Sequence, residues 1–584
     1  MKTNNYTIEF PEKEFDYVAD YISKHGVWEK RTTDFIKENL KAGMTFVDVG
    51  AQAGYYTLLA HSLGAHVQAF EPSTKNRELL EKNIKENNFS GIEVLPFALS
   101  NRSEKMKLYN GKTSGENSLI DTGKDFEEVD VVTYDSLFSS EPDMIKIDVE
   151  GCEKEVLQGM NDVLNTDKVI YVIIEDWYNK VTDWLIDTYG FKLITTDRGF
   201  GNRILVKNKE VEEIKEPLRI HLLGVFNTPT TLGDEGIGNA FGSKVVRMAK
   251  ILKKLGHYVI FYGVEGSDVE CDEFVQVSTK DILERTYGPW HKEKIYGCQF
   301  GDLAYTTFNK NTIREINDRK LFGDFLLCCF GSYQKEIADA VNIADTIEIG
   351  IGYTGSFARF RIFESEFQKN WSYGSEGKGD IAWYDKVIPG YFEPEDFTFS
   401  KEKDDYYLYL GRIISRKGVS IAQEVCQKLG KKLVIAGFGM SIEENKVDGE
   451  FFNEIIKRPN VEYVGFAGLE KRKELMSKAK AVFMPTTYLE PFGYVAIEAM
   501  FSGTPVITTD GGAFPETNIN GLTGYRCNTF ADFLKAVEDV DKLDKDKIRQ
   551  YAMDNYTLEK AIPKYDEYFN RILNLYTTKG WYHE

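Results

Sequence analysis

Short apolar, β-rich runs alternate with longer amphipathic stretches along almost the whole chain. This alternation is typical of βαβ units, in which helices connect the strands of a parallel sheet. The clearest expected strands fall into three series and are 45–50, 65–72, 92–99 and 144–151; then 218–226; then 406–412, 432–439, 461–466, 481–486 and 504–510. The pattern therefore predicts an α/β fold made of three Rossmann-like domains.

Two breaks in the pattern suggest where the domains meet. Residues 207–218 are strongly charged and contain a proline, as linkers often do. Two prolines in 387–397 precede the third series of strands. We predict domains at 1–210, 218–390 and 391–584, with a linker at 211–217 and a last helix that packs back on the middle domain.

Composition narrows the class of protein. The net charge of −20 argues against nucleic-acid binding, which needs clustered Lys and Arg. Seven cysteines without a C-x-x-C pair indicate neither a disulfide framework nor a zinc site. With no signal-peptide pattern and no apolar run of about 18 residues, we expect a cytoplasmic protein without a transmembrane segment. Peripheral membrane contact and the oligomeric state stay open.

The run FVDVGAQAGYYTLLA (46–60) indicates a strand, a turn of small residues and a helix. Gly50 and Gly54 would let the backbone approach a ligand closely, but the turn is not the G-x-G-x-x-G of dinucleotide-binding proteins. Glu71 ends the next strand, 23 positions after Asp48, where an acid can accept hydrogen bonds from both hydroxyls of a ribose. The alternative is that both acids are solvated strand ends.

Two later runs, FALSNRSEKMKLY and MIKIDVEGCEKEVLQG, follow where further strands should end. With VDVGAQAGYYT and the FEPS turn, they resemble the FkbM family of methyltransferases over about residues 20–205. The resemblance implies a Rossmann-like domain that transfers a methyl group from S-adenosylmethionine to a hydroxyl, often on a sugar. It implies a cofactor pocket that includes Asp48, with Gly50, Ala51 and Gly54 near the methionine, Glu71 at the ribose, and Ala98 to Ser100 at the adenine.

Methyl transfer to a hydroxyl needs a proton acceptor, because an alcohol is a poor nucleophile at neutral pH. Asp148 and Glu150 follow an expected strand and are our candidates, and Glu175 ends the next one. The three carboxylates could instead hold a divalent cation, although we predict no metal. In a third interpretation Asp148 only caps the following helix.

In YLGRIISRKGVS (409–420), Arg412 and Lys417 follow a strand and precede a helix. Two cations beside a helix start suit a diphosphate, although they could also be surface charges. Further along, Glu490 and Glu498 form an E-x7-E pair, and Pro491 indicates that Glu490 lies in the loop before the helix. One carboxylate can then bind a sugar and the other a ribose.

The order of GR-x4-KG, E-x7-E and AMFSGTPVITTDGGAFPE resembles the GT-B glycosyltransferases of family 4, over about residues 218–575. The resemblance implies two Rossmann-like domains, retention of anomeric configuration and no bound metal. It implies that Arg412 and Lys417 bind the donor diphosphate, Glu490 the transferred sugar as a catalytic residue, and Glu498 the ribose. Further expected donor contacts are Gly236, Gly238, Phe492 and Gly493.

The chain departs from that family's pattern in places. The stretch 346–367 lacks the histidine often found near the reacting sugar, for which Tyr353 or Glu348 could substitute. Tyr494 replaces a small residue after FG, which leaves the sugar preference open. We expect His221, His257 and His291 to be structural.

Together these features predict a bifunctional enzyme. It would transfer a sugar from a nucleotide-diphosphate sugar to a glycan, a lipid-linked acceptor or another hydroxyl-bearing molecule, and would O-methylate a hydroxyl with S-adenosylmethionine. The alternative keeps the glycosyltransferase and makes residues 1–210 an inactive acceptor-binding or docking module. An NAD-dependent first domain is disfavoured because G-x-G-x-x-G is missing.

Overall fold

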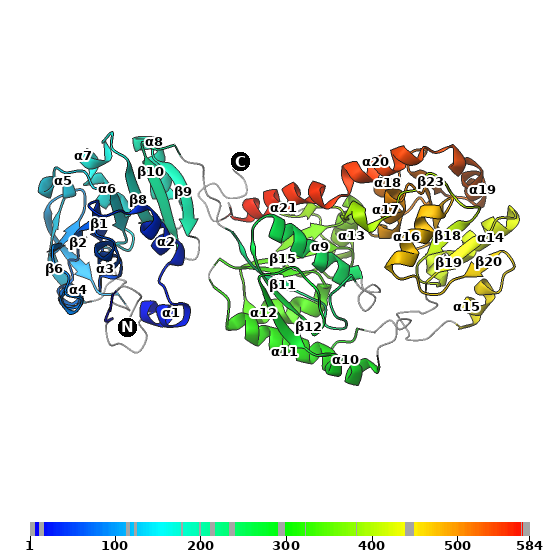
Figure 1. Cartoon of the computed structure of the whole chain (residues 1–584), viewed down its shortest axis with the longest axis horizontal. Coiled ribbons are helices and arrows are strands. Elements are labelled where there is room, and N and C mark those ends of the chain that lie inside the picture. Colours follow the sequence, from blue (N-terminus) through cyan, green and yellow to red (C-terminus); the bar gives the residue numbers. More distant parts are fainter. Residues whose placement is uncertain are drawn as a thin grey trace. The chain divides into compact units, whose positions relative to one another are not determined.

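The chain divides into two compact units, with the boundary between residues 216 and 217. The computed structural model (Figure 1) describes residues 6–10, 17–111, 117–121, 125–176, 179–197, 200–210, 217–232, 240–289, 298–321, 323–380, 382–437, 449–573 and 575. Each unit is described by itself.

The first unit contains a seven-stranded sheet of order β3-β2-β1-β7-β8-β10-β9. Its strands are β1 (Thr45–Val49), β2 (His66–Phe70), β3 (Ile92–Leu95), β7 (Met144–Ile147), β8 (Ile170–Glu175), β9 (Lys192–Asp197) and β10 (Asn202–Lys207). The first five strands in this order are parallel, and β10 runs antiparallel to both of its neighbours. Because the order reverses between β1 and β7, a crevice opens at their carboxyl ends, where ligands of such sheets bind.

Helices cover both faces of this sheet. They are α1 (Tyr17–His25), α2 (Lys30–Asn39), α3 (Tyr55–Ser62), α4 (Thr74–Glu86), α5 (Tyr134–Leu137), α6 (Glu153–Gln158), α7 (Asn161–Leu164) and α8 (Lys180–Tyr189). One core joins α2 and α3 to Phe46, Met144 and Ile173, and the other joins α6, α7 and α8 to Val47 and Ile145. Alternate strand residues thus enter opposite cores, as the twofold repeat of a strand requires.

The expected strand 92–99 is wrong as a single element. It is two strands, β3 in the main sheet and β4 (Phe97–Leu99), which pairs with β6 (Phe126–Val132). With β5 (Glu104–Tyr109) these form a small separate sheet of order β4-β6-β5. Pro96 lies between the two strands, where a residue without an N–H cannot continue the ladder.

The second unit contains two parallel sheets, of order β13-β12-β11-β14-β15-β16-β17 and β20-β19-β18-β21-β22-β23. The strands of the first are β11 (Arg219–Leu223), β12 (Tyr258–Val264), β13 (Glu273–Ser278), β14 (Phe325–Cys328), β15 (Asp345–Ile351), β16 (Phe360–Phe363) and β17 (Lys386–Val387). Those of the second are β18 (Tyr407–Leu410), β19 (Leu433–Ala436), β20 (Val461–Tyr463), β21 (Val482–Met484), β22 (Val506–Thr509) and β23 (Gly524–Cys527). All four residues of β14 and of β19 are buried, as expected for sheets covered on both faces.

The helices of this unit are α9 (Ala240–Lys254), α10 (Lys280–Tyr287), α11 (Leu303–Asn317), α12 (Lys335–Val341), α13 (Glu366–Ser375), α14 (Val419–Lys428), α15 (Gly449–Ile456), α16 (Leu469–Lys478), α17 (Tyr494–Phe501), α18 (Phe514–Thr517), α19 (Phe530–Asp539), α20 (Lys545–Asn555) and α21 (Leu558–Leu573). Both strand orders begin 3-2-1-4, as in doubly wound folds. The predicted α/β class with Rossmann-like domains is therefore confirmed.

The last described helix returns to the first sheet of this unit. α21 packs against α9 (Figure 1). The ring of its Phe569 contacts the rings of His257 and Phe325. The Tyr568 hydroxyl donates to the Tyr384 carbonyl at 2.7 Å. His257 is buried in this packing, His221 is bound to Tyr262 and Asp324, and His291 lies outside the described residues.

The cysteines and the hydropathy of the helices are two further features of the chain. All seven cysteines are free thiols. In the part of the chain that the structure describes, no helix is long and apolar enough to cross a membrane.

Candidate functional sites

The turn between β1 and α3 depends on its glycines. Gly50 has φ +86°, and a Cβ there would lie 2.0 Å from the Asp148 carbonyl oxygen. Gly54 has φ +95°, and its Cβ would meet Leu80 at 2.4 Å. Gly50 therefore excludes a side chain because a backbone oxygen lies so close, whereas at Gly54 the positive φ itself disfavours one.

A pocket opens where β1, β2 and β7 end, at the reversal of the sheet. Five predicted residues line it, namely Gly50, Glu71, Ala98, Leu99 and Asp148. The predicted Asp48, Ala51, Gly54, Ser100 and Glu150 are not among those that line it. Asn117, Ser118 and Leu119 also line it, although they belong to no motif recognised in the sequence.

Asp48 and Glu71 are both buried, so the alternative of solvated strand ends is wrong. Asp48 accepts a hydrogen bond from the Thr57 hydroxyl at 2.6 Å, which fixes α3 to β1. Glu71 accepts backbone N–H bonds from Gln52 at 2.7 Å and Ser73 at 2.9 Å, one on each oxygen. Burial raises the pKa of Glu71 to about 7. The Asn76 side chain also reaches this carboxyl, which lowers the pKa against the effect of burial. A carboxylate has about four acceptor positions, so Glu71 keeps capacity for a ligand hydroxyl.

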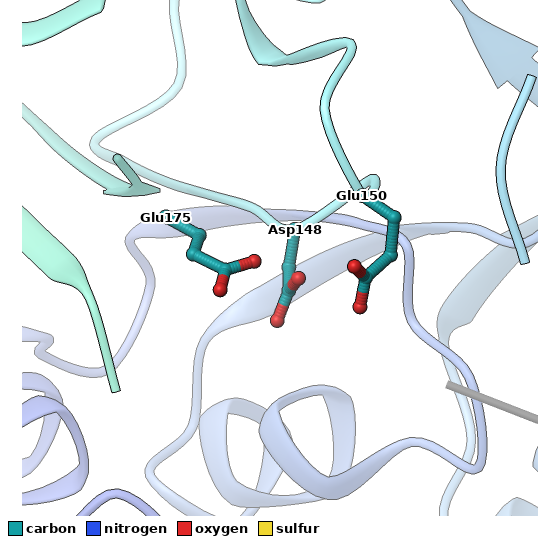
Figure 2. Close-up of side chains that lie close together, drawn as sticks. All are labelled: Asp148, Glu150 and Glu175. Carbon is teal, nitrogen blue, oxygen red and sulfur yellow. The ribbon is translucent and has the colours of Figure 1, made fainter. Parts of the chain in front are cut away.

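Three carboxylates meet beside this pocket. Asp148 follows β7, Glu150 lies two residues further, and Glu175 ends β8 (Figure 2). One oxygen of each lies within 4.8 Å of the others. Asp148 does not cap the next helix, because α6 begins after Cys152 and no side chain caps it.

The buried Lys146 forms an ion pair with one carboxylate of this cluster. Lys146 is 1% exposed, and its Nζ lies 3.0 Å from Asp148 Oδ2. Burial alone would lower the pKa of Lys146, but Asp148 and Glu29 outweigh it and raise the pKa above its ordinary value. Glu29 is also buried, which raises its pKa to about 7, and it accepts a hydrogen bond from Tyr56. Lys146 therefore stays charged, and neither it nor Glu29 was among the candidates from sequence.

In the second unit, the chain after β18 passes through Arg412 to a short turn at Ser415–Lys417 and then to α14. Gly418 begins α14 with φ +72°, and a Cβ there would lie 1.9 Å from the Pro485 carbonyl oxygen. This close approach brings the Lys417 turn against the loop that follows β21. The carboxyl ends of β18 and β21 are the reversal point of this sheet.

Lys417, Tyr488 and Glu490 form a half-buried triad there. Lys417 Nζ lies 3.1 Å from Glu490 Oε2 and 2.5 Å from the Tyr488 hydroxyl, which donates to Glu490 Oε2 at 2.5 Å. Burial lowers the pKa of Lys417, against the opposing effect of Glu490. Glu490 lies in the loop before α17, and Tyr488 was not among the candidates from sequence.

Arg412 lies beside the triad with an unsatisfied donor. Its Nη1 is buried and has no hydrogen-bond partner among the described residues. Burial lowers its pKa, and the charge of Arg416 acts in the same direction. A buried, unpaired guanidinium nitrogen is costly, so it indicates a site for an acceptor group absent from the chain itself. Neither Arg412 nor Lys417 is an ordinary surface charge.

The other predicted donor contacts lie around α17. Glu498 is buried on this helix, is paired with Arg472 of α16, and lines a second pocket with Lys473 and Val495. Gly493, with φ +90°, begins the helix. The Phe492 side chain is buried against the rings of Tyr494 and Tyr556. The predicted Gly236 and Gly238 lie outside the described residues.

The structure also shows the contacts of Glu348, Tyr353 and Tyr494, the residues at which the chain departs from the family pattern. Glu348 is buried and accepts bonds from the Tyr353 hydroxyl and from two backbone amides, so it holds the loop after β15. The Tyr494 hydroxyl donates to Glu364, which also pairs with Lys244 at 2.7 Å. Tyr494 therefore links α17 to the sheet that contains β16.

Comparison with known proteins identifies both regions. Residues 48–199 match the model of the methyltransferase FkbM domain, and residues 393–560 match that of glycosyl transferases group 1. Both resemblances drawn from the sequence are thereby confirmed.

Several curated glycosyltransferases are similar to part of this chain. An uncharacterized glycosyltransferase of Methanocaldococcus jannaschii is 28% identical over 27% of this chain and 44% of its own. Glycogen synthase of Mycobacterium tuberculosis is 34% identical over 20% and 29%. The O-antigen chain mannosyltransferase RfbU of Salmonella typhimurium is 28% identical over 27% and 44%. The chain thus spans less than half the length of these relatives.

Among solved structures, AviGT4, a glycosyltransferase involved in avilamycin A biosynthesis, is similar with 21% identity and a TM-score of 0.46. The match covers 61% of this chain and 98% of that protein.

Proposed function

We propose that a chain carrying an FkbM methyltransferase domain and a group 1 glycosyltransferase domain is a bifunctional glycan-modifying enzyme. It transfers a sugar from a nucleotide-diphosphate sugar with retention of configuration, and it O-methylates a hydroxyl with S-adenosylmethionine. The observation that carries the glycosyltransferase assignment is the Arg412 Nη1, which is buried and has no hydrogen-bond partner among the described residues, beside the Lys417–Glu490 pair. The free thiols suit a reducing compartment, and we therefore propose a cytoplasmic location.

In sugar transfer, Arg412 and Lys417 bind the donor diphosphate, Glu490 the sugar hydroxyls and Glu498 the ribose. The bond from the anomeric carbon to the diphosphate breaks, and its electron pair stays on the diphosphate oxygen. The acceptor hydroxyl oxygen forms the new bond to that carbon, and its proton passes to the departing diphosphate. The two cations stabilise the negative charge as it develops, so bound metal is not needed for this step.

In methyl transfer, the pocket at the end of β1 holds S-adenosylmethionine with its ribose on Glu71. The acceptor hydroxyl oxygen forms a bond to the methyl carbon while the carbon–sulfur bond breaks and its electron pair goes to sulfur. The hydroxyl proton passes to Asp148, with Glu150 beside it. The charged Lys146 lies 3.0 Å from Asp148 Oδ2 and orients that carboxyl for this task.

A donor screen that follows nucleoside diphosphate release would test the glycosyltransferase. In R412A/K417A, loss of both diphosphate contacts should reduce kcat/KM for the donor by at least about 100-fold, since each charged contact contributes about 1.5–3 kcal/mol. The matched control is K428A/K431A, which removes two cations of the same domain that are absent from the triad. Equal kinetics in R412A/K417A and the control would refute the assignment.

The alternative of an inactive docking module is tested separately. Isothermal titration of the full chain with S-adenosylmethionine should show binding, and mass spectrometry of the product should show an added methyl group. Absence of S-adenosylmethionine binding would favour the docking module and leave the glycosyltransferase unaffected.

A further inference from the structure

Three carboxylates gather at the carboxyl edge of the first sheet, beside a buried lysine. They belong to Asp148, Glu150 and Glu175, and the lysine is Lys146, whose Nζ lies 3.0 Å from Asp148 Oδ2. The three carboxylates bring one oxygen each within 4.8 Å of the others and point toward one another (Figure 2). Like charges at this separation repel one another, and a cation among their oxygens would offset that repulsion.

A second observation comes from the neighbouring strand. Asn202 begins β10 and stands directly opposite Glu175 in the antiparallel pair, so the two side chains lie on the same face of the sheet. Asn202 is 1% exposed. Neither its amide nitrogen nor its amide oxygen makes a hydrogen bond of normal geometry with a described residue, although the side chain is close enough to Glu29 to lower the pKa of that carboxyl.

A buried amide without satisfied hydrogen bonds is costly and indicates a missing partner. It lies on the same sheet face and at the same strand end as Glu175, one of the three carboxylates. Carboxylate and amide oxygens are the ligands that hard divalent cations prefer.

We propose that Asp148, Glu150 and Glu175 bind one divalent cation of the Mg²⁺ or Mn²⁺ class, with Asn202 as a ligand or as the partner of a cation-bound water. Asp148 can offer one oxygen to the cation while Oδ2 stays on Lys146. Because Asp148 also lines the proposed donor pocket, the cation would lie beside the methyl group.

This inference rests on the proposed methyl transfer. It makes Asp148 a ligand of the cation in place of the proton acceptor. The cation takes an acceptor hydroxyl as a further ligand and lowers the pKa of that hydroxyl. Its proton then leaves to water, and the oxygen forms the bond to the methyl carbon as the carbon–sulfur bond breaks. An acceptor with two adjacent hydroxyls, as many sugars have, could chelate the cation and fix which oxygen is methylated.

The test is direct binding of Mn²⁺ to the full chain, followed by electron paramagnetic resonance, with Mg²⁺ as competitor. We expect one site, weakened at least about tenfold in E150Q and E175Q, and about 10- to 100-fold in N202A if its role is indirect. E81Q, an exposed carboxylate on α4, is the matched control and should bind as the unmodified chain does. S-adenosylmethionine affinity, measured in each variant, reports whether the pocket is still folded.

No Mn²⁺ binding at millimolar concentration would overturn the inference, as would equal affinity in E175Q and E81Q. Full-rate methyl transfer in excess EDTA would also overturn it while leaving the proposed methyltransferase intact. Mn²⁺ bound at this site without any methylated product would support the cation site and would instead count against the proposed function.

Discussion

Removal of the Tyr488 hydroxyl should lower kcat/KM for the sugar donor roughly 10- to 100-fold. This hydroxyl lies 2.5 Å from both Lys417 Nζ and Glu490 Oε2, which also contact each other directly at 3.1 Å, and Y488F removes it while keeping the ring. The ring remains 4.5 Å from the Lys417 ammonium, so their cation–π contact is retained. Only the position of two charged side chains is therefore altered.

The magnitude follows from the charged partners of this hydroxyl. A hydrogen bond to a charged group contributes about 1.5–3 kcal/mol. Since about 1.4 kcal/mol is tenfold in rate, kcat/KM for the donor should fall roughly 10- to 100-fold if the whole contribution is lost in the transition state. The assay is release of nucleoside diphosphate at varied donor and saturating acceptor.

Y406F is the matched control, because it deletes another half-buried tyrosine hydroxyl of the same domain. That hydroxyl donates to the Leu475 carbonyl at 2.8 Å and contacts no member of the triad. Both variants should lose similar thermal stability, but only Y488F should lose kcat/KM. Equal activity in the two variants would refute a positioning role for Tyr488.

Two further predictions concern the first unit. Burial raises the pKa of Glu71 from 4.5 to about 7, so the folded state keeps a proton that the unfolded state has lost, and stability should fall by up to about 3 kcal/mol as the pH rises from 4.5 through 7. E71Q cannot titrate and should show a shallower decline between pH 5 and 8 in scanning calorimetry of the full chain; a decline as steep as in the unmodified chain would contradict this. G50A places a Cβ 2.0 Å from a carbonyl oxygen and should cost about 2–4 kcal/mol and abolish S-adenosylmethionine binding, with glycosyl transfer retained. G43A, at φ +82° with nothing within 4 Å, should cost only about 1 kcal/mol and keep binding; similar losses in both would show that backbone strain alone is responsible.

Sequence reasoning succeeded where a side chain's place follows from its position at a strand end. Gly50, Glu71 and Asp148 come together because the carboxyl ends of parallel strands share one edge of the sheet. Lys417 and Glu490 meet for the same reason, although 73 positions separate them. In each case the strand pattern and the short loop determine the location without knowledge of other contacts.

Other features depend on contacts that no local pattern encodes. Glu29 reaches Lys146 across more than a hundred residues, and Asn117 to Leu119 enter the pocket from a region without a motif. Two signals were nevertheless present. Pro96 marked the break between β3 and β4, and a lysine in the apolar run MIKID had to be paired if that strand was buried.

The order of the two reactions is constrained by their chemistry. Both consume a hydroxyl, and a methylated oxygen has no proton to lose and cannot accept a sugar. If the same position is used by both, methylation ends the glycan and the product carries either a methyl group or a further sugar there. If different positions are used, one product carries both. Linkage analysis of the glycan made by the intact chain with both donors distinguishes these cases, and G50A, which removes only the methyl donor site, should extend the glycan in the first case and leave its length unchanged in the second.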